Sequence, residues 1–227
     1  MFKTVQSDIQ MLPDPFDYKH AESTGTSIMA LVYDGGVLVG ADSRTTSGSY
    51  IADRAQDKVD YLHERIYCLR SGSAADTQTL CSYVRYYLDV HSMELQRRPT
   101  VKTAAKLFSN LIYQYQDNLS AAVIVAGIDD NEGPSIYACQ PSGSCIKQQV
   151  AIGGSGSGFI FSYVDANFRP NMDLESAKKL VKTALAHAMS RDGSSGGIIR
   201  LVNITKDNVT REFFDHKDLP YHFTNIH

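Results

Sequence analysis

Residues 25–42 are GTSIMALVYDGGVLVGAD, two apolar runs separated by the Asp-Gly-Gly of positions 34–36. A short Gly-containing break between two such runs is typical of a tight turn that joins antiparallel strands. We therefore expect a β-hairpin over residues 27–42, with Thr26 at the start of its first strand.

The rest of the chain alternates between paired strands and paired helices. Strands are predicted at 66–69, 121–128, 135–139, 145–152, 198–204 and 209–214, and helices at 74–94, 101–116, about 160–167 and 173–189. The predicted buried positions are Leu80, Val84, Tyr87, Leu88 and His91 in the first long helix, and Leu107, Phe108, Leu111, Ile112 and Tyr115 in the second. This order predicts an α+β fold in which two antiparallel sheets pack face to face with helix pairs outside, rather than alternating βαβ units.

Composition favours one globular domain. The chain has 227 residues, 43% hydrophobic and 21% charged, and no Pro/Gly/Ser-rich linker divides it. A net charge of -3 argues against a nucleic-acid surface, and the absence of an 18-residue apolar stretch argues against a membrane span. The seven histidines match no metal-binding or serine-hydrolase motif, so we expect no metal and no Ser/His/Asp chemistry.

The four cysteines form no C-x-x-C pair, so reduced thiols are expected, as in the cytosol or nucleus. The first 25 residues contain acidic residues and prolines but no apolar core typical of a secretory signal. They are interpreted as a removable pro-segment, residues 1–25, followed by a single domain over residues 26–227.

Thr26 has the clearest chemical context. If the Gly25–Thr26 bond were cut, Thr26 would carry a hydroxyl nucleophile and a free α-amine of pKa about 8, able to accept the hydroxyl proton. A lysine such as Lys58 would stabilise the developing alkoxide, and a carboxylate such as Asp42 would hold that lysine. Taken alone, a Gly-Thr dipeptide more often contains an ordinary strand threonine, and an Asp and a Lys such as Asp42 and Lys58 more often form an ordinary surface ion pair.

Five ordered blocks of sequence, at residues 25–30, 40–46, 70–78, 154–157 and 192–196, carry a family resemblance. In them the chain resembles the proteasome β subunits, N-terminal-nucleophile threonine proteases, and within that family the β1 type with caspase-like specificity. The resemblance extends from Gly25 to about Phe214. It implies the four-layer αββα sandwich of the N-terminal-nucleophile hydrolase fold.

The resemblance also implies roles for individual residues. Thr26 is the nucleophile, with Asp42 and Lys58 beside it, and Ser155, Asp192 and Ser195 position its amine. Gly72 supplies the oxyanion N–H. The implied substrate-binding residues are Thr45, Thr46, Ser47, Arg70, Ala74 and Gln78, with Arg70 favouring an acidic residue before the cut bond. No metal or organic cofactor is implied.

Without the resemblance, the sequence around Asp192 and Ser195 would be interpreted as a helix-ending turn and the glycine-rich residues 153–158 as a flexible loop. A phosphate cradle at 153–158 is disfavoured because no Gly-Lys-Ser/Thr follows. Two positions depart from the β1 pattern, Gln56 and Asp60. A carboxylate at Asp60 would either neutralise Arg70 and weaken the acidic preference, or point to solvent.

The expected function is that of a catalytic β1-type subunit of the 20S proteasome, activated by self-cleavage between Gly25 and Thr26 and cutting after acidic residues. Such a subunit works in stacked heptameric rings with other α and β subunits, on unfolded polypeptides, in ubiquitin-dependent degradation in cytoplasm and nucleus. Two alternatives stay open: a non-catalytic structural β subunit, and a free-standing amidase of the N-terminal-nucleophile class.

Overall fold

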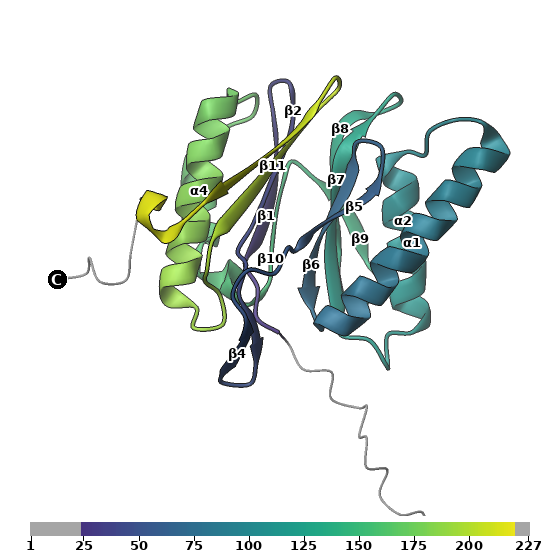
Figure 1. Ribbon diagram of the computed structural model, residues 1–227. Coiled ribbons are helices and arrows are strands. Elements are labelled where there is room, and N and C mark those ends of the chain that lie inside the picture. Colours follow the sequence, from purple (N-terminus) through teal and green to yellow (C-terminus); the bar gives the residue numbers. More distant parts are fainter. Residues whose placement is uncertain (1–23, 221–227) are drawn as a thin grey trace, which may run out of the picture.

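Two five-stranded antiparallel sheets face each other in the structure, a computed structural model that describes residues 24–220 (Figure 1). The first sheet contains β10 (Val150–Gly153), β1 (Ile28–Tyr33), β2 (Gly36–Ala41), β11 (Ile199–Thr205) and β12 (Val209–Phe214), in that order. The second contains β5 (Val59–His63), β6 (Ile66–Gly72), β7 (Ala121–Asp129), β8 (Gly133–Cys139) and β9 (Cys145–Gln148). A separate hairpin, β3 (Thr45–Ser47) with β4 (Tyr50–Asp53), extends from the body of the molecule.

Helices cover the outer face of each sheet. α1 (Ala74–Leu95) and α2 (Val101–Gln114) lie against the second sheet, and α4 (Leu174–Arg191) lies against the first (Figure 1). The 3-10 helix η1 (Ser155–Phe159) and the short α3 (Phe161–Asn167) lead into α4, and a second 3-10 turn, η2 (His216–Asp218), follows β12. The predicted α+β class and the four-layer αββα sandwich are confirmed.

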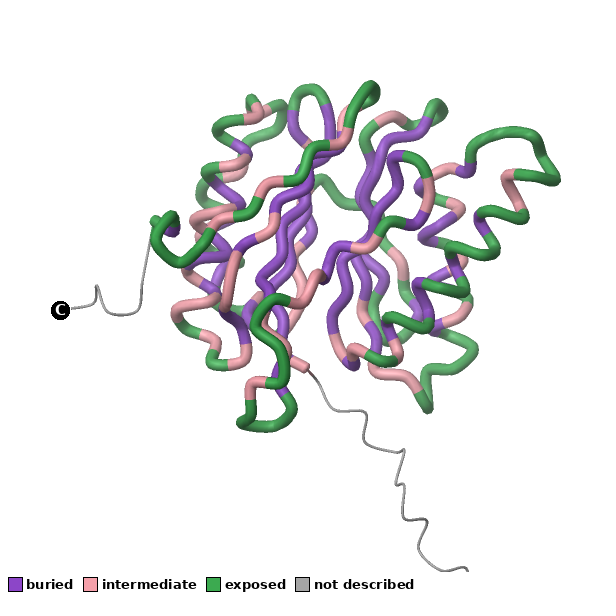
Figure 2. Tube along the Cα trace, in the orientation of Figure 1, coloured by how far each residue is buried: buried purple, intermediate pink, exposed green. Residues whose placement is uncertain are grey.

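Strand alternation fills three apolar layers. In β1, Ile28 and Ala30 face the opposite sheet, whereas Met29 and Leu31 face α4. A third layer lies between the second sheet and helices α1 and α2, with Phe108 at 0% exposure. Both faces of the central strands are therefore buried, which explains their nearly continuous apolar sequences (Figure 2).

Side-chain caps fix where the long helices begin. At the starts of α1, α2 and α4, the side chains of Ser73, Thr100 and Asp173, respectively, accept a hydrogen bond from a backbone N–H group. The predicted helix starts are thereby confirmed within one residue.

Several element predictions were wrong. The hairpin β3–β4 and strand β5 were not expected, because these strands are short and their apolar residues lack a clear period of two. The predicted strand at 145–152 is two strands in different sheets, β9 and β10, since the chain crosses between layers at Gln149. Tyr87 and Tyr115 are 46% and 48% exposed, not buried, because only one narrow face of each helix meets the sheet.

The described part of the predicted 26–227 domain forms one sandwich. Of the predicted pro-segment, only residues 24 and 25 lie within the described range. Among the described residues, no helix is both long and apolar enough to cross a membrane.

Candidate active site

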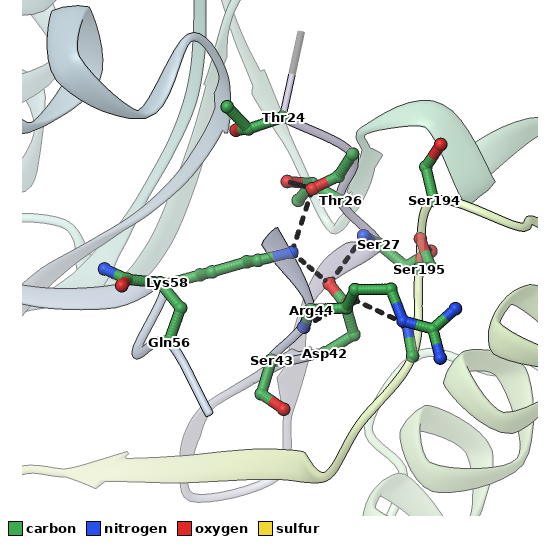
Figure 3. A network of polar contacts seen from close by, with 12 residues as sticks. Thr24, Thr26, Ser27, Asp42, Ser43, Arg44, Gln56, Lys58, Ser194 and Ser195 are labelled. Carbon is green, nitrogen blue, oxygen red and sulfur yellow. Dashed lines mark hydrogen bonds and ion pairs between the residues drawn. The ribbon is translucent and has the colours of Figure 1, made fainter. Parts of the chain in front are cut away.

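Thr26 lies where the ends of both sheets meet. Asp42 directly follows β2 of the first sheet, and Lys58 directly precedes β5 of the second. All three residues are at most 5% exposed. The packing of the two sheets thus brings together three groups that are far apart in the sequence, and Figure 3 shows their side chains pointing toward one another.

The Asp42 carboxylate is held by four donors. Lys58 Nζ donates to Asp42 Oδ1 at 2.7 Å, and the backbone N–H of Ser27 donates to the same oxygen at 2.9 Å (Figure 3). The N–H groups of Gly196 and Arg44 donate to Oδ2 at 3.0 and 3.2 Å. An acceptor that satisfies four donors must be an ionised carboxylate, so the pair with Lys58 is ionic.

Burial opposes the charge on both members of this pair. It raises the pKa of Asp42 and lowers the pKa of Lys58, and in each case the charge of the partner acts in the opposite direction. The Lys58 ammonium therefore gives up its proton more readily than an ordinary lysine does.

The Lys58 ammonium also reaches the bond that was predicted to be cut. Lys58 Nζ donates to the Gly25 carbonyl oxygen at 3.0 Å, and the Thr26 hydroxyl contacts the same oxygen. The Gly25–Thr26 peptide bond is intact in this structure. A hydroxyl and a cation thus converge on the carbonyl group of that bond.

The nitrogen of Thr26 faces a second polar network. Its N–H donates to Ser155 Oγ at 3.0 Å, and Ser155 Oγ lies 2.7 Å from Asp192 Oδ2. Ser195 Oγ donates to the same carboxylate oxygen at 2.6 Å, and Ser27 Oγ lies 2.8 Å from Ser195 Oγ. Since Ser195 donates its proton to Asp192, Ser27 is the donor in the last contact.

Glycine is required on both sides of Thr26. Gly25 has φ +64°, and a Cβ there would lie 2.4 Å from the Ser194 carbonyl oxygen. Gly156, in η1, would place a Cβ 2.0 Å from Ser27 Oγ. These close approaches let the chain before Thr26 and the turn behind it pack directly onto the site.

The residue before Gly25 is bound as an added strand. The Thr24 N–H and hydroxyl both lie within hydrogen-bond distance of the Gly72 carbonyl oxygen, at 3.2 and 2.9 Å, and Thr46 N–H donates to the Thr24 carbonyl oxygen at 2.8 Å. Thr46 and Gly72 are two of the residues predicted to contact an extended peptide. The chain's own Thr24 occupies that position here.

A small pocket lies beneath Thr26. Its lining includes Thr45, Arg70 and Ala74, three of the residues implied to bind substrate, together with Gln56, Gly72 and Thr77. Gln78 is exposed on α1 and Ser47 is exposed at the end of β3, so neither lies in the lining of this pocket.

Asp60 does not point to solvent. Its carboxylate forms an ion pair with Arg70 Nε, and Arg70 Nη2 donates to the Asp57 carbonyl oxygen at 3.0 Å. The Arg70 side chain is 8% exposed, whereas that of Asp60 is 29% exposed. Of the two alternatives considered for Asp60, the structure has the one in which Arg70 is neutralised.

Asp60 also lies near two cysteines, Cys68 and Cys81, with ligand atoms within 4.8 Å of one another. This group does not suit a cation. Burial raises the pKa of the Cys68 thiol well above its usual value, and the Asp60 carboxylate is already paired with Arg70.

Sequence reasoning missed Ser27, Thr24 and Gly196 as parts of the site. Ser27 acts through its backbone N–H as well as its hydroxyl, and Gly196 through its N–H alone. Backbone donors carry no residue signature, although Ser27 and Gly196 both fall within the blocks that carried the resemblance.

Comparisons with known proteins identify the family of this chain. The family model for the proteasome subunit matches residues 22–204. The chain is 54% identical over 201 residues to proteasome subunit beta type-6 of Dictyostelium discoideum, covering 88% of this chain and 94% of that protein. It is 52% identical over 190 residues to a probable proteasome subunit beta type-1 of Schizosaccharomyces pombe, covering 84% of each.

A third relative is proteasome subunit beta type-9 of Homo sapiens, 47% identical over 197 residues, or 87% of this chain and 90% of that protein. Membership of this family implies assembly with other proteasome subunits. The fold, the five sequence blocks and these similarities lead to one conclusion: the chain belongs to the proteasome subunit family, as a β subunit similar to types 1, 6 and 9.

Proposed function

We propose that this β subunit is a threonine endopeptidase that cuts its own Gly25–Thr26 bond and then uses Thr26 on other polypeptides. The observation that carries the proposal is the convergence of the Thr26 hydroxyl and the Lys58 ammonium on the Gly25 carbonyl oxygen. A structural role alone requires neither the buried Lys58–Asp42 pair nor its contact with this particular bond.

Self-cleavage follows from this arrangement. Thr26 Oγ1 attacks the Gly25 carbonyl carbon, and Lys58 stabilises the negative charge that develops on the oxygen. The C–N bond breaks, the Thr26 nitrogen takes up the proton that the Thr26 hydroxyl gives up, and the acyl group is left as an ester on Oγ1. Water then hydrolyses the ester, releasing the carboxyl group of Gly25 and leaving Thr26 with a free amine and a free hydroxyl.

The mature site reuses the same groups. The Thr26 amine replaces the amide nitrogen that now faces Ser155, and it accepts the hydroxyl proton as Oγ1 attacks a substrate carbonyl. Ser155, Asp192 and Ser195 orient that amine, while Asp42 keeps Lys58 charged and directed. Water activated by the amine releases the acyl-enzyme.

An extended substrate takes the place of Thr24. It pairs with Thr46 and Gly72 through backbone hydrogen bonds, as Thr24 does, and the Gly72 N–H stabilises the oxyanion. The residue before the cut bond enters the pocket at Arg70, Thr45 and Ala74, where the guanidinium favours an acidic side chain. Gln78 and Ser47 contribute at the rim.

The proposed setting is a pair of stacked heptameric β rings capped by α rings, in cytoplasm and nucleus, acting on unfolded polypeptides. The second candidate is a non-catalytic structural β subunit. This second candidate is kept because neither the fold nor the contacts between ring subunits require a nucleophile.

The test uses particles that contain this chain, treated with a threonine-directed electrophile and examined by intact mass and N-terminal sequencing. Wild-type chain is expected to begin at Thr26 and to carry the adduct there. Thr26→Ala is expected to keep residues 1–25 and to remain unlabelled. Thr79→Ala, on the exposed face of α1, is the matched control and is expected to behave as wild type.

A wild-type chain that still begins at Met1 and takes no label in assembled particles would overturn the catalytic proposal. The structural-subunit candidate would then be favoured.

A further inference from the structure

Two pairs of thiols are in contact in this structure, and neither has a role in the proposed chemistry of Thr26. Cys68 Sγ lies 3.1 Å from Cys81 Sγ, and Cys139 Sγ lies 2.9 Å from Cys145 Sγ. All four cysteines are free. The pairs differ in access, because Cys68 and Cys81 are both buried whereas Cys145 is partly exposed.

Cys139 and Cys145 face each other across β8 and β9, at directly opposed positions in the antiparallel register. The next pair toward the turn is hydrogen-bonded, since Gln140 N–H donates to the Ser144 carbonyl oxygen at 2.8 Å. Hydrogen-bonded and non-hydrogen-bonded pairs alternate, so the cysteines occupy a non-hydrogen-bonded position, where Cα atoms are about 4.5 Å apart. That separation is within the range of a disulfide bond, about 4.4–6.8 Å.

Cys145 opens into a groove of about 760 Å³ between α2 and the β8–β9 turn. The groove is also lined by Lys102 and Lys106 of α2, His91 of α1 and Tyr137 of β8. Its cationic groups give it a charge that suits an anionic small molecule.

The chemistry of the two thiols is unequal. The two sulfur atoms are in hydrogen-bond contact, and Cys139 Sγ also lies 3.6 Å from the Ala105 carbonyl oxygen. Contact with Cys139 and the charge of Lys106 lower the pKa of the Cys145 thiol, while partial burial opposes both. Contact with Cys145 and burial raise the pKa of Cys139. Cys145 is the partly exposed thiol of the pair and lines the groove beside Lys106, so it is the thiol that reacts as a thiolate.

We propose that Cys139 and Cys145 form a reversible thiol modification site for small anionic disulfides of the glutathione type, with Cys145 as the attacking thiol and Cys139 as the resolving thiol. The proposal is independent of the proteolytic function, because it uses no group of the Thr26 site.

The reaction is two thiol–disulfide exchanges. The Cys145 thiolate attacks one sulfur of oxidised glutathione, an S–S bond forms between Cys145 and glutathione, and one glutathione thiolate leaves and is protonated. With Cys145 no longer anionic, Cys139 attacks Cys145 Sγ, and its proton passes to the departing glutathione thiolate. A Cys139–Cys145 disulfide forms and the second glutathione leaves as the thiol. Two protein thiols are oxidised and one oxidised glutathione is reduced to two glutathione molecules.

The experiment incubates the full-length chain with graded oxidised glutathione, alkylates the remaining thiols after denaturation, and maps the peptides by mass spectrometry. The wild-type chain is expected to lose two hydrogens in the peptides that hold Cys139 and Cys145. Cys139→Ser is expected to accumulate one glutathione on Cys145 because no resolving thiol remains. Cys145→Ser is expected to show neither product at this site.

Cys68 and Cys81 serve as the matched internal control, since their sulfur atoms are also in contact but are shielded from solvent. They are expected to remain alkylatable under conditions that oxidise Cys139 and Cys145. Lys106→Gln is expected to slow the first step by roughly threefold, the scale of an exposed charge contact.

The proposal fails if wild-type Cys139 and Cys145 stay reduced, or if Cys68 and Cys81 oxidise at the same rate. It also fails if Cys139→Ser, folded by circular dichroism, gains no adduct on Cys145. The wild-type comparison of the two pairs needs no variant, so a poorly folded variant does not prevent the test.

Discussion

Lys58 lies with its ammonium between the Asp42 carboxylate and the Gly25 carbonyl oxygen. Burial lowers the pKa of Lys58 from the ordinary lysine value of 10.5, although the Asp42 charge opposes this shift. Catalysis as proposed requires the charged ammonium, so kcat/KM is expected to fall with rising pH at a lower pH than ordinary lysine titration would give.

The measurement is the pH profile of peptide hydrolysis, together with the titration of ¹³C-labelled lysine side chains by NMR. One buried lysine is expected to titrate below the exposed lysines and to match the alkaline limb of the activity. A profile that stays flat to the pH where exposed lysines titrate would contradict this prediction. The acidic limb is assigned separately to the Thr26 amine, whose ordinary pKa is about 8.

In the proposed substrate pocket, Asp60 offsets the charge of Arg70. In Asp60→Thr the guanidinium loses its ion pair, so the ratio of cleavage after Glu to cleavage after Gln is expected to rise roughly tenfold, because a charge-assisted hydrogen bond contributes about 1.5–3 kcal/mol. The measurement is kcat/KM for a pair of peptides that differ only in that residue.

Asp57→Asn is the control for this variant. Asp57 contacts Arg70 only through its backbone oxygen, and its carboxylate pairs with Arg211 at the surface. The Glu to Gln ratio of Asp57→Asn is expected to equal that of wild type. An unchanged ratio in Asp60→Thr, with hydrolysis intact, would show that Asp60 does not govern selectivity.

Most of the candidate site residues that contribute a side chain could be predicted from the sequence, whereas Gly196, which contributes only a backbone N–H, could not. Thr26, Asp42, Lys58, Ser155, Asp192 and Ser195 were all named from the sequence, and the structure brings them together. The contact of Asp60 with Arg70 was left open, since a sequence does not say which rotamer a carboxylate on a strand adopts. Ser27, which directly precedes β1, was missed because part of its contribution is a backbone N–H, which carries no residue signature.

At the scale of elements, η1 brings Ser155, which is proposed to position the amine, to Thr26 just before β1 by a close approach that only glycine permits. A Cβ at Gly156 would meet Ser27 Oγ, and it would also lie 3.3 Å from Asp192 Oδ2. Gly156→Ala is expected to reduce kcat/KM by roughly ten- to hundredfold, because a misplacement of about 1 Å costs on that order. It is also expected to lower the free energy of unfolding by about 1–3 kcal/mol through overpacking.

Gly158 belongs to the same 3-10 turn, and a Cβ there would meet no atom within 4 Å. Gly158→Ala is therefore the matched control and is expected to retain wild-type kinetics. Equal activity of the two variants, measured alongside thermal unfolding, would mean that the approach of η1 does not position the site.

The long helices and strands could be predicted from the sequence because their apolar residues recur with a clear period and because capping residues mark the helix starts. The elements that were predicted wrongly are short or lie where the chain crosses from one layer to another. β3 and β4 contain mostly polar residues, and the division between β9 and β10 depends on which sheet each half joins. Which sheet a strand joins depends on tertiary contacts. The sequence of residues 145–152 therefore did not reveal that this segment divides between two sheets.

At the scale of the whole molecule, the segment that leads into the sandwich shares the site with Thr26. Gly25 has a positive φ and no room for a side chain, so Gly25→Ala is expected to slow self-cleavage roughly tenfold or more, since the left-handed conformation alone costs about 1–2 kcal/mol. The chain that is eventually cut is expected to have wild-type kcat/KM, because residue 25 leaves with the pro-segment.

The measurement follows the conversion of precursor to mature chain by gel or mass. Gly48→Ala is the control, since Gly48 also has a positive φ, +58°, but has open space where its Cβ would be. It is expected to convert at the wild-type rate. A Gly25→Ala precursor that converts as fast as Gly48→Ala would refute the requirement for glycine.

Thr24 is bound to Thr46 and Gly72 while still covalently joined to the nucleophile two residues later. In the proposed self-cleavage, the nucleophile, the cation and the carbonyl group to be cut are therefore present in one chain, and the bond is presented without any encounter between molecules. Conversion is then expected to be first order, with a half-life independent of dilution. It is also expected to happen once per molecule, because hydrolysis would remove the tether and leave the groove open to polypeptides that must arrive by diffusion.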